Sequence, residues 1–201
     1  IMSSDWSSDV CSSDLVGKPV WSWWLKKWAG VDTETGMPTW YINGKDGETT
    51  TDYNEAEKAY QGANALPTYN GGVSLHIDYK GIYLNATGNF AGGHKILERW
   101  AEYYMHRGLY PTGLFQGMEH LMDRWQEPGD EAANPKRVYG FYPLDSEPST
   151  RWLYDGDYFR LSGLTLGYNL PSSLTERIGA NSIRVYARAT NYFTWVKDDG
   201  L

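Results

Sequence analysis

Two alternating stretches near the end of the chain, joined by a short polar connection, constrain its fold more than any other feature. The first runs from Tyr158 to Leu170 and the second from Ile183 to Trp195. Their apolar residues recur at every second position, as Leu164, Leu166, Tyr168 and Leu170, then as Ile183, Val185, Ala187 and Ala189. Polar or small residues fill the positions between, as Thr165, Gly167 and Asn169, then as Arg184, Tyr186, Arg188 and Thr190. Since successive strand side chains point to opposite faces, each stretch predicts a strand with one apolar and one polar face.

The length of these strands and the composition are typical of a barrel wall in a membrane. A transmembrane strand needs only about ten alternating residues, and its polar positions keep the hydropathy low. The 201 residues include 10 Trp and 16 Tyr, and the mean hydropathy is -0.58. Much of the apolar area therefore comes from amphipathic rings, which concentrate at interfaces, glycan sites and barrel rims. No run of about eighteen apolar residues exists, which excludes a transmembrane helix.

The same alternation appears in the first half of the chain. Val73, Leu75, Ile77 and Tyr79 alternate with Ser74, His76, Asp78 and Lys80, and the pattern resumes after Gly81 with Ile82, Leu84 and Ala86. This pattern predicts further strands with an apolar exterior and a polar interior, and Gly81 predicts a bulge or a tight turn.

Residues 1–16 are expected to lie outside the fold, which is assigned to residues 17–201. The leader repeats Ser-Ser-Asp three times without an apolar period. Ser and Asp favour caps and turns over packed elements. The leader resembles a translated sequencing adapter, and the alternative is a natural disordered linker. Cys11 is the single cysteine, which excludes an intrachain disulfide framework.

The remaining segments are expected to form loops and short connecting elements. The Trp-rich residues 21–28 fit either a short strand or an amphipathic surface helix, and the glycines and proline that follow favour the strand. Asp32 to Gly36 predicts a turn. Long loops are expected at about residues 43–70 and 91–151, with two short helices between Ile96 and Trp125.

Few residues predict chemistry. His76 and Asp78 share a strand face and are two metal-ligand types, but a solvated pair is favoured because no third ligand is in view. Asp155 and Asp157 resemble part of a calcium loop, and a turn is favoured because the remaining ligand spacing is missing. The carboxylate pairs Glu98 with Glu102 and Glu127 with Asp130 do not define a catalytic cleft. We therefore expect no enzyme, no cofactor and no metal.

Several aromatic residues of the expected loops offer surfaces for sugar rings or for a partner protein. They are Trp40, Tyr41, Tyr139 and Tyr142. Packing or a position at the barrel rim is the more common role of such side chains. A net charge of -7 argues against nucleic acid as a partner.

Several sequence blocks occur along the chain in a recognisable order. They are GVDTETGMPTWY at 30–41, LPTYNGGVSLHIDYKGIYLNATGNF at 66–90 and RWQEPGDEAANPKR at 124–137, followed by DGDYFRLSGLTLGYNLP and IRVYARATNYFTW. In content and order these blocks resemble the C-terminal barrel region of the SusC/RagA family of TonB-linked outer-membrane proteins. This resemblance implies an all-β fold: antiparallel strands from the C-terminal part of a large transmembrane barrel, with short helices in an extracellular loop.

The resemblance also implies a function and partners. The implied function is import of glycans or peptides across the outer membrane of Bacteroidota. The implied partners are a SusD-like lipoprotein, which forms a lid, and TonB, which would act through an upstream region that this chain lacks. About five or six barrel strands are expected, in a piece truncated at both ends that is inactive and aggregation-prone alone. The polar side chains that would line the lumen are His76, Asp78, Arg184 and Arg188. A peptide importer of the RagA type and a secreted β-sandwich that binds carbohydrate remain alternatives, and the sandwich would bury the apolar strand faces.

Overall fold

The structure, a computed structural model, describes residues 12–13, 16–99, 119–138 and 144–198. The chain divides into two compact units. The small-sheet unit comprises residues 1–66, 95–154 and 200–201, and the long-sheet unit comprises residues 67–94 and 155–199. Each unit is described by itself below.

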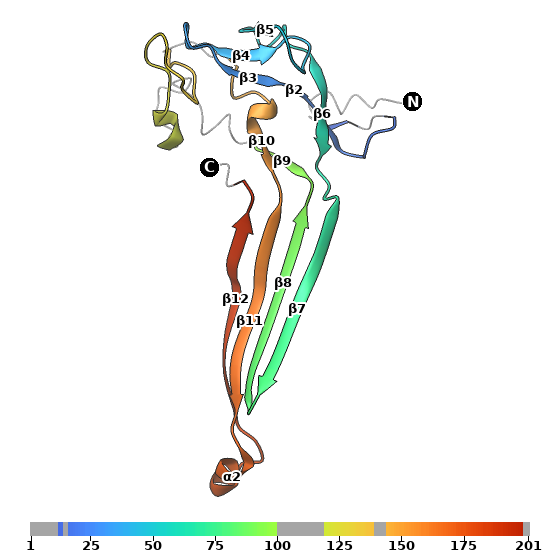
Figure 1. Cartoon of the computed structure of the whole chain (residues 1–201), viewed down its shortest axis with the longest axis vertical. Helices are drawn as coiled ribbons and strands as arrows, with labels where there is room; N and C mark the ends of the chain where they lie inside the picture. The colour runs from blue at the N-terminus through green and yellow to red at the C-terminus, as the bar shows by residue number, and fades with distance from the viewer. Residues whose placement is uncertain (1–11, 14–15, 100–118, 139–143, 199–201) are drawn as a thin grey trace. The chain divides into compact units, whose positions relative to one another are not determined.

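The long-sheet unit is a four-stranded antiparallel sheet (Figure 1). Its strands are β7 (Tyr69–Tyr79), β8 (Ile82–Gly92), β11 (Tyr158–Asn169) and β12 (Arg184–Val196), and they lie in the order β12-β11-β8-β7. The alternating stretches therefore form strands, as predicted. At about 3.4 Å per residue the eleven residues of β7 extend about 34 Å. A tilt of about 40° reduces this length to a height of about 26 Å, close to the apolar band of a transmembrane barrel.

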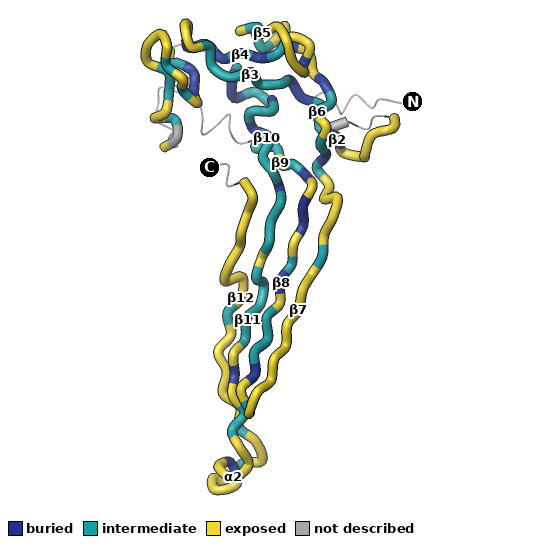
Figure 2. Tube along the Cα trace, viewed as in Figure 1, coloured by how far each residue is buried: buried dark blue, intermediate teal, exposed yellow. Residues whose placement is uncertain are grey.

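The register places the alternating apolar residues of the four strands on one face of the sheet. Leu75 lies opposite Ala86, which lies opposite Leu164, which lies opposite Ala189. The neighbouring row contains Ile77, Leu84, Leu166 and Ala187. Among the described residues this face is exposed: Leu75 is 50% and Leu166 54% exposed. Figure 2 shows most of β7 and β12 as exposed. A soluble sandwich would bury these side chains, so the structure argues against that alternative.

The two hairpins of this sheet turn by different means. Lys80 and Gly81 connect β7 to β8 with φ of 47° and 87°, so both central residues of this two-residue turn have positive φ, as type I′ turns require. The tight turn predicted at Gly81 is confirmed. The connection from β11 to β12 contains the short helix α2 (Ser172–Thr175) and the 3-10 turn η4 (Glu176–Ile178), where only a polar connection was predicted.

Several glycines of the sheet lie beneath aromatic rings of neighbouring strands. A Cβ atom on Gly71 would lie 2.7 Å from the Phe90 ring, and one on Gly88 would lie 2.9 Å from the Phe159 ring. The Tyr83 ring covers Gly167 still more closely. Aromatic rings that cover glycines in this way pin the register of a sheet.

The small-sheet unit contains short strands. One sheet has the order β1 (Ser12–Ser13), β2 (Ser22–Lys26) and β6 (Lys58–Asn64), and another has β3 (Trp28–Val31), β4 (Pro38–Tyr41) and β5 (Thr49–Thr50). A third pairs β9 (Lys95–Leu97) with β10 (Leu153–Asp155), and the 3-10 turns η2 (Glu119–Met122) and η3 (Thr150–Trp152) lie in irregular chain. The strand favoured within residues 21–28 is confirmed, and the helical alternative is wrong. The turn predicted at residues 32–36 is confirmed too: Asp32 Oδ1 accepts hydrogen bonds from the amides of Glu34 and Thr35, and Gly36 has φ of 68°.

Three expectations differ from the structure. The expected loop at 43–70 contains β5, which pairs with β4, and β6, which pairs with β2. The polar side chains of these short strands obscured them in the sequence. The first helix expected between Ile96 and Trp125 falls mostly outside the described residues, and the described part of the second is the 3-10 turn η2. Four strands of membrane-crossing length exist in the described residues, where five or six were expected. In the same residues, no helix is long and apolar enough to span a membrane.

Candidate functional site

The polar face of the long sheet brings all four predicted lumen residues together on one side. His76, Asn85, Thr165 and Arg188 form one row across the strands, and Asp78, Tyr83, Gly167 and Tyr186 form the next. Arg184 lies opposite Asn169 on the same face. Because neighbouring strands are about 4.8 Å apart, His76 on β7 and Arg188 on β12 are separated by about 14 Å. The four residues share a face of the sheet but do not form one cluster, and two groups of contacts can be described.

The first group is His76 with Asp78. The imidazole is paired with the Asp78 carboxylate and hydrogen-bonded to the Asn85 side chain. Both side chains are more than half exposed, at 60% and 57%. In the described part of the chain, no group of three or more His, Cys, Asp or Glu residues is placed to hold a metal ion. This pair is thus arranged as a polar, solvated patch on β7.

The second group surrounds Arg184. Its Nε donates a hydrogen bond of 2.8 Å to Asn169 Oδ1, and its guanidinium lies 5.2 Å from the centre of the Tyr83 ring. Tyr83 is buried because it covers Gly167, and it therefore provides a fixed aromatic support for the arginine. Sequence reasoning missed Tyr83, because its role depends on Gly167, which is far away in the sequence and lies next to Tyr83 only in the folded sheet. Only the register reveals this pair.

Asp155 and Asp157 lie where the chain enters β11, and both bind groups of the protein itself. Asp157 Oδ1 accepts a 2.7 Å hydrogen bond from the Gly93 amide, and Lys197 Nζ lies 3.1 Å from Asp155 Oδ2. The hydrogen bond from Lys197 to Asp155 and the negative charge of that carboxylate raise the pKa of Lys197. Asp155 is the last residue of β10, and Gly156 and Asp157 connect it to β11 in irregular chain, so the turn predicted here is not observed.

The predicted loop aromatics have different outcomes. Trp40 is fully buried, with edge-on contacts to Trp28 and Tyr53 at 5.5 and 5.4 Å between ring centres. Trp40 therefore cannot offer its ring to a ligand in this structure, and the packing alternative applies to it. Tyr41 is partly exposed, and the Lys27 ammonium lies 5.3 Å from its ring centre. Tyr139 and Tyr142 lie outside the described residues.

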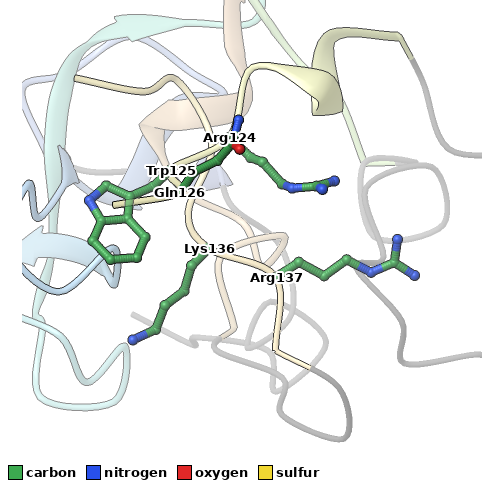
Figure 3. A pocket seen from close by; sticks show the side chains of 5 residues that line it. All are labelled: Arg124, Trp125, Gln126, Lys136 and Arg137. Carbon is green, nitrogen blue, oxygen red and sulfur yellow. The ribbon is translucent and has the colours of Figure 1, made fainter. Parts of the chain in front are cut away.

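A basic hollow in the small-sheet unit was not predicted. It has a volume of about 520 Å³ and is lined by Arg124, Trp125, Gln126, Lys136 and Arg137 (Figure 3). The sequence signal was available, since three cations lie within a Trp-containing stretch of an acidic chain. Acidic residues between these cations obscured it, because charges that alternate along a sequence need not share a surface.

The ends of the apolar face carry aromatic side chains. Phe90, Phe159 and Trp195 form a row near one end, and Tyr79 and Tyr168 lie in the last row at the other end. Aromatic girdles flank the lipid-facing band of transmembrane barrels. With one exposed apolar face, one polar face and strands of membrane-crossing length, the sheet is part of the wall of a large transmembrane β-barrel.

Known proteins similar to this chain are TonB-dependent receptors. The chain is 38% identical to the TonB-dependent receptor P3 of Formosa agariphila over 52 residues, which are 26% of this chain and 5% of that protein. It is 24% identical to the TonB-dependent receptor P26 of the same organism over 131 residues, 65% of this chain and 13% of that protein. No protein-family model matches the chain.

The solved structures point to the same type of barrel. The RagAB peptide importer in its "open-open" state matches 94% of the chain with a TM-score of 0.75 and 28% identity. A structure of the RagAB peptide transporter matches 88% with a TM-score of 0.72 and 27% identity. The resemblance to the SusC/RagA type of TonB-dependent receptor is therefore confirmed. This chain spans 20% and 19% of those two solved chains, respectively.

Proposed function

We propose that this chain forms part of the wall of an outer-membrane importer that is energised through TonB and takes up oligosaccharides. The observation that carries the proposal is the two-faced sheet of β7, β8, β11 and β12, whose apolar face is exposed and whose polar face carries charged residues. The likeness to TonB-dependent receptors supports transport as the purpose of this wall. The relatives found are receptors and transporters, which supports a role without catalysis.

In this proposal the polar face lines the lumen. His76, Asp78, Arg184 and Arg188 are then exposed to water and to the passing ligand. A charged side chain on the opposite face would meet lipid at a cost of several kcal/mol, about 2–4 for Arg or Lys at the midplane. All four residues lie on the face where that cost is absent.

The long connections are proposed to lie outside the cell and the short ones at the periplasmic side, the usual arrangement of such barrels. Residues 43–70 and 91–151 then contribute to the outer surface, where a SusD-like lipoprotein is the proposed lid. The short turn at Lys80 and Gly81 and the connection that contains α2 are placed in the periplasm.

A peptide is the alternative cargo, because the similar solved structures are described as a peptide transporter and a peptide importer. The test uses the organism that carries the gene, with the coding sequence deleted and then restored. Uptake of fluorescent oligosaccharides and of fluorescent peptides of similar size is measured in each strain, with a TonB-deficient strain as control. Loss of oligosaccharide uptake alone is expected. Loss of peptide uptake alone would assign the importer to peptides, and unchanged uptake of both would contradict import.

A further inference from the structure

The basic hollow of the small-sheet unit has the composition of an anion site. Three of its five lining residues are cations and none is acidic, although the chain as a whole has a net charge of -7. In Figure 3 the side chains of Arg124 and Arg137 extend to one side of the hollow, and those of Trp125 and Lys136 lie on the other. Positive charge is thus concentrated on a local surface of an acidic protein.

These cations are available to a ligand. Within the described residues, Arg124, Lys136 and Arg137 form no ion pair with an acidic side chain. The nearby Asp130 uses its Oδ2 to accept hydrogen bonds from the amides of Gln126 and Glu127, at 2.9 and 3.1 Å. The Asp130 carboxylate therefore stabilises its own turn. No carboxylate is among the residues that line the hollow.

Polar groups with little exposure stabilise the backbone of the residues that carry the cations. Asn134 is 2% exposed, and its carbonyl accepts a 2.9 Å hydrogen bond from the Trp125 amide. Its side chain accepts a 2.5 Å hydrogen bond from Arg151, whose guanidinium is also paired with Asp145 at 2.6 Å. A site whose supporting residues are fixed in this way loses less conformational entropy when a ligand binds.

The aromatic wall of the hollow is fixed as well. Trp125 Nε1 donates a 2.7 Å hydrogen bond to the Thr33 carbonyl. The indole ring lies against the backbone of Gly36, where a Cβ atom would collide with it. The Lys136 ammonium lies 5.7 Å from the ring centre. An immobile indole beside cations is suited to contact the apolar face of a sugar ring that also carries a negative group.

We propose that this hollow binds an acidic oligosaccharide, with the carboxylates of uronic acid residues held by Arg124 and Arg137 and a sugar ring placed against Trp125. Arg guanidinium groups bind carboxylates through paired, charge-assisted hydrogen bonds. The inference rests on the proposed function and refines it, because it names the chemical class of the imported oligosaccharide.

A sugar fits the hollow better than a peptide does. Extended peptides commonly bind by adding a strand to an exposed sheet edge. The backbone amides of Trp125 and Lys136 are already hydrogen-bonded to the carbonyls of Asn134 and Gly36, so the chain that lines the hollow offers no such edge there. Side-chain cations and an indole remain as the recognition groups.

The test measures binding of a galacturonic acid oligosaccharide to the full chain in detergent micelles by calorimetry. The fully methyl-esterified form of the same oligosaccharide has equal length but no charge, and a glutamate-rich peptide of equal charge is the third probe. The variants Arg124→Gln and Arg137→Gln are compared with Lys45→Gln, which removes an exposed cation from a turn outside the hollow. Circular dichroism and tryptophan fluorescence establish that each variant has the sheet content of the parent chain.

The acid form is expected to bind, and each arginine variant to weaken its affinity at least about tenfold, the usual loss for one charge-assisted hydrogen bond. The Lys45→Gln variant is expected to bind the acid form with unchanged affinity. The methyl ester is expected not to bind. Equal binding of the ester would overturn the role of the cations, and equal or tighter binding of the peptide would overturn the sugar class. Absence of binding by all three probes would overturn the site, but it would leave import itself untouched, since this assay needs neither TonB nor transport.

Discussion

At the scale of single residues, the charge of Arg151 makes several contacts within the small-sheet unit. Its guanidinium pairs with Asp145, bonds to Asn134 and lies 4.6 Å from the ring centres of Trp28 and Trp152. Burial lowers the pKa of Arg151 to about 10, so the group remains charged at neutral pH. One cation thus joins segments that share no regular secondary structure.

The first prediction concerns this cation. Arg151→Met removes the charge but keeps much of the side-chain volume, and it removes the ion pair with the Asp145 carboxylate, which is 1% exposed. Breaking a buried pair from one side costs about 3–5 kcal/mol. Urea unfolding followed by tryptophan fluorescence is expected to show a loss of that size. The double variant with Asp145→Asn is expected to recover part of it, and equal stability of the single and double variants would contradict the pairing.

At the scale of elements, the glycines under aromatic rings determine how β8 and β11 lie together. Gly167→Ala places a methyl group in the volume of the Tyr83 ring, which must then leave its position. Overpacking of this kind costs about 1–3 kcal/mol. Gly163→Ala is the matched control on the same strand, because its nearest neighbour would be Thr87 at 4.0 Å. Equal thermal stability of both variants in detergent would show that Tyr83 does not depend on this glycine.

The faces of β7 give the third prediction. Leu75 and Ser74 are adjacent near the middle of the strand and point to opposite faces. Leu75→Arg exposes a charge to acyl chains and is expected to lower the free energy of unfolding in lipid vesicles, and so the stability, by about 2–4 kcal/mol. Ser74→Arg places the same charge on the polar face and is expected to have a small effect. If the two variants lose equal stability, the assignment of the faces is wrong.

At the scale of the whole molecule, the sequence predicted the features that follow from the alternation of apolar and polar residues. It did not predict contacts between residues that are far apart in the sequence. Alternation over Val73 to Ala86 and Leu164 to Thr190 was enough to predict the strands and their faces, because a strand's side chains obey a strict period of two. The contacts of Tyr83 with Gly167, and of Arg151 with Asn134, join residues that have no periodic relation. Such contacts follow from register and from irregular loops, which local sequence does not encode.

The edges of the long sheet give the last prediction. β7 and β12 are its outermost strands in the described residues, and each presents one side without a hydrogen-bonded neighbour strand. Unpaired strand edges recruit other chains, and lipid-facing side chains favour an apolar phase. The 201-residue chain is therefore expected to aggregate in buffer and to become monodisperse in detergent, as measured by size-exclusion chromatography with light scattering. The aromatic side chains of Trp195 and Tyr79 on these edges are 51% and 65% exposed. A monodisperse monomer in plain buffer would mean that the apolar face is buried in solution, and the barrel-wall assignment would then fail together with the importer.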